Sequence, residues 1–290
     1  MKFHALSDIG KCRGENQDCY GRVSCNHAFL AVVCDGMGGA AAGRLAAKTV
    51  ADCMTEEIEG TLMRRGKDKP PMTALEIKRL LWASLDRANR QVYEMAAADD
   101  ALNGMGTTLV AAFFYYGQVY TVHVGDSRAY LYREGQLKRL TRDHSLVQGM
   151  VDAGTLTEEE ARVHPSRNVI TRAVGVSDAV TAEYGTLPIR AGDRFLLCTD
   201  GLTGLVPDAR ITSFFEAGKS DEVTAGALVN EALSAGGEDN VTVFLVSAGE
   251  EDVYSVWDAL ADVRTEEITA TFERATGEVP EVRTGREEFE

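Results

Sequence analysis

The sequence has too little positive charge for a protein that binds nucleic acid. Its 290 residues include 30 lysines and arginines against 45 aspartates and glutamates, which gives a net charge of −15. Proteins that bind nucleic acids neutralise the phosphate backbone with basic surface. A nucleic-acid partner is therefore not expected.

Long hydrophobic runs are also missing. No stretch approaches the roughly 18 apolar residues of a membrane span, and the opening MKFHALSDIG has no apolar segment typical of a signal peptide. The six cysteines include no CxxC pair. Without a signal peptide, reduced cysteines are the better expectation. These absences predict a cytoplasmic protein without a membrane partner.

Histidine is scarce as well. None of the five stands at zinc-ligand spacing from another: His4, His27, His123, His144 and His164. A zinc site is therefore not expected.

Much of the negative charge lies at the C-terminal end. Residues 249–290 contain thirteen acidic and four basic residues, which is −9 of the total −15. Such a composition is typical of a solvated segment. We expect one domain at 1–248, an acidic and partly disordered tail at 249–290, and a monomer.

The pattern of apolar residues predicts two antiparallel sheets. Strands are expected at 28–34, 107–115, 118–124, 128–132, 194–199 and 241–246, and helices at 43–59, 73–97 and 220–235. The YYGQ junction is typical of a hairpin turn. Strands joined by short turns favour an α/β (α+β) sandwich with helices outside the sheets over a doubly wound parallel sheet.

The stretch VVCDGMGG at 32–39 places Asp35 between a buried-looking strand and three glycines. Two interpretations compete. Gly36, Gly38 and Ala41 match G-x-G-x-x-A, which can cradle a dinucleotide. However, Asp35 would then stand beside the pyrophosphate, and no alternating βαβ pattern follows. The other interpretation is that Asp35 holds a cation.

Other aspartates stand at comparable places. Asp200 also follows an apolar run and precedes glycine, Asp126 follows YTVHVG, Asp239 precedes NVTVFLV, and Asp18 lies in the loop RGENQD. An isolated aspartate at such a place is usually a turn former. Several in one site would repel one another unless cations neutralised them. Oxygen ligands without histidine favour Mg²⁺ or Mn²⁺.

Taken together, six motifs closely resemble the metal-dependent protein phosphatases, the type 2C serine/threonine phosphatases, in their bacterial form. They occur in the family's order: RGENQD (13–18), VVCDGMGG (32–39), GMGTT (104–108), VGDSRAY (124–130), CTDGL (198–202) and GEDNVT (237–242). The resemblance implies a four-layer αββα sandwich with a metal centre at one end. It also implies hydrolysis of phosphoserine and phosphothreonine on proteins, opposing a bacterial serine/threonine kinase.

The resemblance assigns roles to single residues. Asp35 corresponds to a carboxylate that bridges two Mg²⁺ or Mn²⁺ ions, with the Gly36 carbonyl on one of them. Asp200 and Asp239 correspond to ligands of the other ion. Asp126 corresponds to a ligand, shared with Asp200, of a third and weaker ion.

The remaining motif residues complete the expected catalytic set. Asp18 corresponds to an acid that holds water at the metal site, and Arg13 to the arginine that grips the substrate phosphate. Arg13, Asp18 and Asp35 are thus the expected catalytic residues. Thr107 and Asn240 are expected to support the ligands, and residues 143–175, the flap segment, to shape substrate access.

The chain departs from the family at one place. Many members carry a histidine at the position of Met37 or of Ala40, proposed to protonate the leaving oxygen. His144 and His164 in the flap segment are possible substitutes. Two alternatives stay open. One is a phosphatase of a partner-switching regulator, and the other is a catalytically weak adaptor that binds phosphoproteins.

If no side chain protonates the leaving group, the enzyme should cleave p-nitrophenyl phosphate well and phosphoserine peptides slowly, since only the serine alkoxide needs a proton. Ala40→His should then raise kcat for the peptide by up to ~10²-fold and leave the nitrophenyl ester unchanged. The measurement is kcat for both substrates in both proteins across neutral pH at fixed Mn²⁺. An equal effect on both substrates would make the missing histidine a neutral departure.

Overall fold

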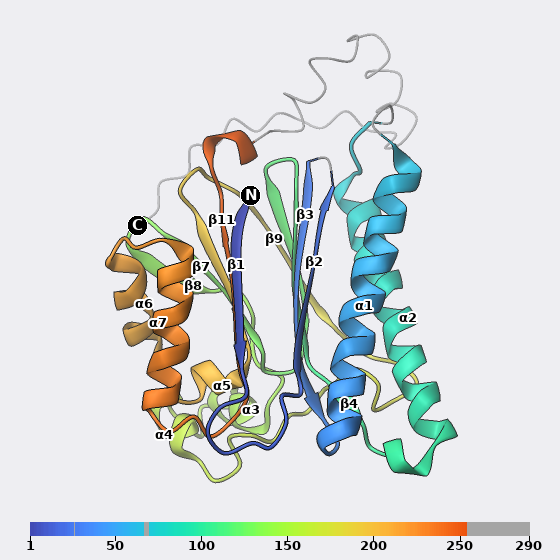
Figure 1. The fold of residues 1–290 in the computed structure, drawn as a ribbon, viewed down its shortest axis with the longest axis vertical. Coiled ribbons are helices and arrows are strands. Elements are labelled where there is room, and N and C mark those ends of the chain that lie inside the picture. Colours follow the sequence, from blue (N-terminus) through green and yellow to red (C-terminus); the bar gives the residue numbers. More distant parts are fainter. Residues whose placement is uncertain (26, 67–69, 254–290) are drawn as a thin grey trace.

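Two antiparallel β-sheets lie face to face, and helices cover the outer face of each (Figure 1). The computed structural model describes residues 1–25, 27–66 and 70–253. The first sheet has the order β1 (Lys2–Asp8), β11 (Val241–Ser247), β10 (Arg194–Cys198), β7 (Arg128–Arg133) and β8 (Gln136–Arg139). The second has the order β2 (Asp18–Cys25), β3 (Ala28–Met37), β5 (Leu109–Tyr115), β6 (Gln118–Val124) and β9 (Glu183–Pro188), with β4 (Gly106–Thr107) beside β3. The predicted four-layer αββα sandwich is confirmed.

Alternate side chains along the central strand β3 pack into two different hydrophobic cores. In β3, Phe29 and Ala31 lie in the layer between the sheets, whereas Leu30 and Val32 face the helices. Both faces of the strand are therefore buried, which is why its sequence is continuously apolar rather than alternating. The central strands are held rigidly on both sides up to the point where they end.

Two helix layers enclose the sheets. Helices α1 (Ala40–Arg65) and α2 (Ala74–Ala98) cover the second sheet, and α5 (Asp200–Thr203), α6 (Asp208–Glu216) and α7 (Asp221–Ser234) cover the first (Figure 1). A capping box between Thr73 and Glu76 starts α2. Among the described residues, no helix combines the length and the apolar composition that crossing a membrane requires.

The predicted strands and helices are all present, with shifted limits. The strand expected at 107–115 is divided at Thr108 into β4 and β5, and α1 is longer than its expected range. The strands β1, β2, β8 and β9 were missed. All four are edge strands with partly exposed residues, so none carries a continuous apolar run. The hairpin at YYGQ is confirmed: Tyr116 and Gly117 both have positive φ, as a type I′ turn requires.

The flap segment lies at the end of the sandwich where β3 meets β4. It contains α3 (Leu146–Asp152) and α4 (Glu158–Val163), close to α5 (Figure 1). Arg162 Nη1 in α4 donates a hydrogen bond to the Thr203 carbonyl at the end of α5, at 3.2 Å. Short 3₁₀ turns η1 (Asp100–Leu102) and η2 (Glu250–Asp252) complete the described elements.

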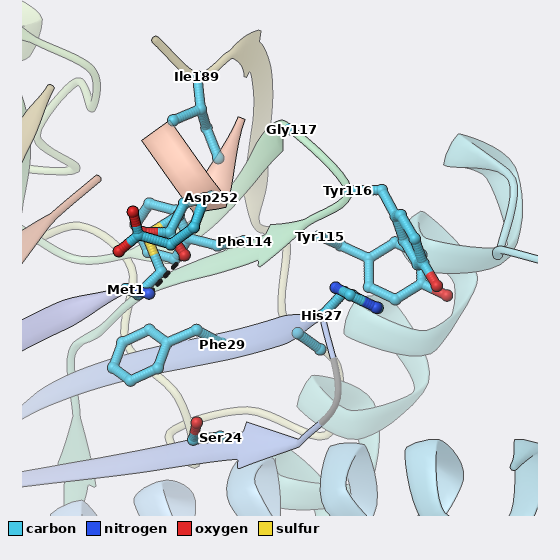
Figure 2. A pocket seen from close by; sticks show the side chains of 12 residues that line it. Met1, Ser24, His27, Phe29, Phe114, Tyr115, Tyr116, Gly117, Ile189 and Asp252 are labelled. Carbon is cyan, nitrogen blue, oxygen red and sulfur yellow. Dashed lines mark hydrogen bonds and ion pairs between the residues drawn. The ribbon is translucent and has the colours of Figure 1, made fainter. Parts of the chain in front are cut away.

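The chain after β11 returns to the opposite end of the sandwich. There the Met1 ammonium donates to Asp252 Oδ1 at 2.5 Å (Figure 2). This pair lines a cavity of about 230 Å³ that Phe29 and Phe114 also line. Asp252 therefore ties η2, which follows the boundary predicted at Ala248, to the domain. Residues 254–290, most of the predicted tail, lie outside the described residues.

Truncation after Ala248 should destabilise the domain slightly without reducing phosphopeptide turnover. It removes Asp252 and leaves a largely buried ammonium without its partner, which costs about 1–3 kcal/mol. Truncation after Val253 keeps the pair and is the matched control. Thermal unfolding should show a Tm several degrees lower for the shorter protein only. A large loss of turnover in both would show that the tail takes part in catalysis.

Candidate metal centre

Five carboxylates gather where the central strands end, beside the flap segment. They are the five aspartates that the sequence singled out: Asp18, Asp35, Asp126, Asp200 and Asp239. Asp18 and Asp35 lie directly opposite each other in the β2–β3 pair. Asp35 and Asp200 lie close enough for each to shift the pKa of the other. The structure thus brings together residues that are up to 221 positions apart in the chain, from Asp18 to Asp239.

Burial and mutual repulsion disfavour the charged forms of these acids. Burial, followed by the charge of Asp18 and then of Asp200, raises the pKa of Asp35 well above its usual range. Burial raises the pKa of Asp18 to about 7. The pKa values of Asp126 and Asp200 are also raised, first by burial and then by a neighbouring carboxylate. Nearby Arg128 opposes these shifts at Asp126 and Asp200 but does not outweigh burial and repulsion.

Two carboxylate oxygens in this cluster are buried without a partner. Among the described residues, Asp18 Oδ1 and Asp200 Oδ1 are buried and accept no hydrogen bond. An unpaired buried acceptor is costly, and a bound cation would satisfy both oxygens and the negative charge. A donor set made of oxygens fits Mg²⁺ or Mn²⁺. The residues present therefore fit the metal that the sequence predicted.

The other oxygen of Asp18 is held by two threonines that sequence reasoning missed. Thr199 Oγ1 donates to Asp18 Oδ2 at 2.9 Å, and Thr242 Oγ1 donates to it at 2.7 Å. Both threonines stand in the motifs CTDGL and GEDNVT, but neither was assigned a role. Their hydroxyls fix one oxygen, so the unpaired Oδ1 has a defined direction.

The glycines after Asp35 let a helix approach the end of β3. A Cβ atom on Gly36 would lie 2.1 Å from the carbonyl oxygen of Gly43 in α1, so only glycine fits. Gly38 and Gly39 have φ values of 107° and 91°, which side chains resist. The strand pairs among the described residues are antiparallel, which excludes the doubly wound fold that the dinucleotide interpretation requires.

Neighbouring threonines hold the backbone of Asp35 at three points. Its carbonyl accepts hydrogen bonds from Thr107 Oγ1 and from the Thr108 amide, both at 2.8 Å. Its amide donates to Thr108 Oγ1 at 3.0 Å. Thr107 thus supports Asp35 through the backbone, which fixes where the carboxylate starts.

Asn240 holds the loop that carries Arg13. Its side chain accepts from the Gln17 amide at 2.8 Å and donates to the carbonyls of Ile9 and Glu15. Arg13 Nη2 donates to Asp239 Oδ2 at 2.7 Å, and this bond raises the pKa of Arg13. The Arg13 side chain is 49% exposed. A guanidinium thus stands at the rim of the acidic cluster, reachable from solvent.

Asp126 is held through the residue before it. Gly125 has a φ of 101° and is clamped by His144: the His144 amide donates to the Gly125 carbonyl at 2.9 Å, and the Gly125 amide donates to His144 Nδ1 at 3.1 Å. The turn before Asp126 is therefore attached to the start of the flap segment.

His144 also stacks on His123, with 4.8 Å between the ring centroids. Sequence spacing could not reveal this pair, and together with Glu183 it forms a cluster of three potential ligands. However, His144 Nδ1 accepts from Gly125, which places the ring proton on Nε2. This Nε2 lies 3.2 Å from Glu183 and 3.1 Å from Arg172 Nη1. His123 Nε2 must likewise carry a proton because it donates to the Arg142 carbonyl at 2.8 Å. The hydrogen bonds thus favour a structural role over metal binding.

The same contacts weigh against His144 as the substitute acid. Burial lowers the pKa of His144, so its ring is mostly neutral near pH 7. Both of its nitrogens already face partners. His164, at the end of α4, accepts the Ser166 amide on Nδ1 at 3.1 Å.

A cavity leads from the carboxylates under the flap segment. It has a volume of about 450 Å³, and Asp126 and Asp200 form part of its wall together with residues of α3, α4 and α6. Substrate approaching the carboxylates would therefore contact the flap segment.

Comparisons with known proteins agree with this architecture. The family model described as protein phosphatase 2C matches residues 13–234. A serine/threonine phosphatase, stp, from Listeria welshimeri is 36% identical over 247 residues, which cover 85% of this chain and 95% of that protein.

Solved structures agree as well. The Streptococcus agalactiae serine/threonine phosphatase superposes with a TM-score of 0.77 at 34% identity, covering 85% of this chain and 99% of that one. The catalytic domain of the serine/threonine protein phosphatase PstP, in complex with two manganese ions, gives a TM-score of 0.72 at 34% identity over 86% and 98% of the two chains. The chain therefore belongs to the protein phosphatase 2C family, the metal-dependent serine/threonine phosphatases, in its bacterial form.

Proposed function

We propose that the five carboxylates hold divalent ions and that the protein hydrolyses phosphoserine and phosphothreonine on proteins. The observation that carries this proposal is the pair of buried, unpartnered oxygens of Asp18 and Asp200 within a cluster of acids. A structural role alone gives no reason to bury acceptors without donors. The manganese complex of PstP and the names of the relatives support the same assignment.

Charge explains why a phosphatase needs this arrangement. A phosphomonoester dianion would be repelled by the bare carboxylates. Two divalent ions, when bound, neutralise that charge and lower the pKa of water so that hydroxide is available near neutral pH. We assign Asp35, the Gly36 carbonyl, Asp200 and Asp239 to these two ions, and Asp126 with Asp200 to a third, weaker one.

The chain's own residues would bind and orient the substrate. Arg13 can donate two parallel hydrogen bonds to phosphate oxygens, which a lysine cannot. In doing so it would exchange its bond to Asp239 for one to substrate, because both acceptors lie at the same rim. Asp18, with one oxygen fixed by two threonines, would use the other to orient water.

Partners and location follow as parts of the same proposal. The substrates would be targets of a serine/threonine kinase, and the cavity under the flap segment would receive residues that flank the phosphorylated one. The protein's net charge of −15 disfavours binding to nucleic acid. All six cysteines are free thiols, which suits the reducing cytoplasm. We propose a monomer whose tail, 249–290, is dispensable for catalysis.

Turnover of a phosphothreonine peptide should vanish in EDTA and return with Mn²⁺ or Mg²⁺. Asp35→Asn and Asp239→Asn should each reduce turnover to background, because losing one ligand charge releases an ion. In the metal-free state Asp35→Asn should raise Tm by roughly 2–4 °C, since it removes one of several repelling charges and stabilises the fold by ~1 kcal/mol. Mn²⁺ should raise Tm in the wild type and much less in these variants.

Glu94→Gln is the matched control, because Glu94 is an exposed acid on α2. It should leave turnover, Tm and the Mn²⁺ response unchanged. Full activity of the metal-free protein would exclude the metal mechanism. Peptide binding without turnover in the presence of Mn²⁺ would favour the adaptor alternative.

Asp126→Ala should weaken catalysis while the two tight ions stay bound. Asp126 follows β6, whereas Asp35 and Asp239 belong to the ends of β3 and β11, so its loss should empty only the weaker site. Calorimetric titration with Mn²⁺ should count one site fewer in the variant. Loss of the tight sites would instead place Asp126 in the two-ion core.

A further inference from the structure

A buried asparagine on α2 binds the last residue of the flap segment and two residues just after it. Asn89 has no exposed surface. Its Oδ1 accepts from the Gly175 amide at 2.7 Å, and its Nδ2 donates to the carbonyls of Ser177 at 3.0 Å and Asp178 at 3.2 Å. These three bonds use most of what an amide can make, and they all go to one short backbone segment.

The backbone around Gly175 is shaped to meet this helix. Gly175 has a φ of 89°, and a Cβ there would lie 2.1 Å from Val92 Cγ1 on α2. The segment therefore approaches α2 as closely as a backbone can. An aspartate at position 89 could still accept from Gly175 but would oppose an oxygen to the other two carbonyls.

From Gly175 the hydrogen bonds continue to the metal centre. The preceding residue, Val174, exchanges two backbone hydrogen bonds with Thr107. The Thr107 amide donates to the Val174 carbonyl at 3.0 Å, and the Val174 amide donates to the Thr107 carbonyl at 2.8 Å. Thr107 Oγ1 in turn donates to the carbonyl of Asp35 at 2.8 Å, and Thr107 is the register partner of Gly36. A continuous path thus joins α2, the end of the flap segment and the backbone of the residue assigned as the bridging ligand.

We propose that Asn89 is a positioning residue for the metal centre: by fixing residues 175–178 it holds Val174 against Thr107, and through Thr107 it sets the Asp35 backbone. Asn89 touches neither metal nor substrate, and it acts through another residue. The inference rests on the proposed role of Asp35 as a ligand. It explains why a fully buried position on α2 carries an amide where the buried residues around it on the helix, Leu85, Ala88 and Val92, are apolar.

The test uses the full-length protein in its metal-free form. Asn89→Asp should raise the Kd for Mn²⁺, measured by calorimetry, roughly tenfold, which is the lower range for residues that orient metal ligands. It should also speed hydrogen exchange in residues 105–109, because the Thr107 amide loses its fixed acceptor. Asn89→Leu should have the same effects; if it does not fold, Asn89→Asp carries the test.

Ser84→Ala is the matched control. Ser84 is a polar residue buried on the same helix, but its hydroxyl bonds Leu80 within α2 and not the flap segment. This variant should leave the Mn²⁺ Kd and the exchange at 105–109 unchanged even if its Tm falls. A role in folding alone would lower Tm in both variants and change the Kd in neither.

A double-mutant cycle with Thr107→Val separates the path from independent effects. If Asn89 acts through Thr107, the double variant should bind Mn²⁺ more tightly than the two single losses together predict. Additive losses, a wild-type Kd in Asn89→Asp, or an equal loss in Ser84→Ala would each overturn the proposal. If Asp35→Asn binds Mn²⁺ as the wild type does, the ligand assignment fails instead, and exchange at 105–109 still decides whether the path exists.

Discussion

Repulsion among carboxylates that share one end of the sandwich is the constraint on which the site depends. Asp35 stands near four other aspartates, and each of them raises its pKa. In water the acids would separate or take up protons. Here the ends of β2, β3, β6, β10 and β11 hold them together, and buried cores on both faces of each sheet keep those strand ends from moving apart. The fold therefore keeps several carboxylates close together, and positive charge bound among them would relieve their repulsion.

The residues around the five aspartates hold parts of the backbone and single carboxylate oxygens. Other carboxylate oxygens keep no hydrogen-bond partner among the described residues. Thr107 and Thr108 hold the Asp35 backbone, Thr199 and Thr242 hold one oxygen of Asp18, and Asn240 holds the loop of Arg13. None of them neutralises charge. Such a pattern costs stability in the empty protein and gains it when cations bind, which is how a site can be preorganised for metal.

Much of this could be predicted from the sequence, because aspartates beside glycine at the ends of apolar strands are local signals. Asp35 and Asp200 are examples. Supporting residues whose partners are distant in the sequence could not be predicted. Thr242 bonds Asp18 across 224 positions, and Asn89 bonds Ser177 across 88. The pairing of His123 with His144 also depends on how β6 meets the flap segment. The edge strands β1, β2, β8 and β9 were missed because partial exposure removes the apolar run.

We expect divalent cations to bind between these carboxylates. Anomalous diffraction from a crystal of the wild-type protein grown with Mn²⁺ tests it most directly, because it locates the ions without reference to activity. We expect two strong peaks on either side of the Asp35 carboxylate, one of them beside the Gly36 carbonyl and the other between Asp200 and Asp239. Absence of peaks within the cluster, or strong peaks only at His123, His144 and Glu183, would contradict it.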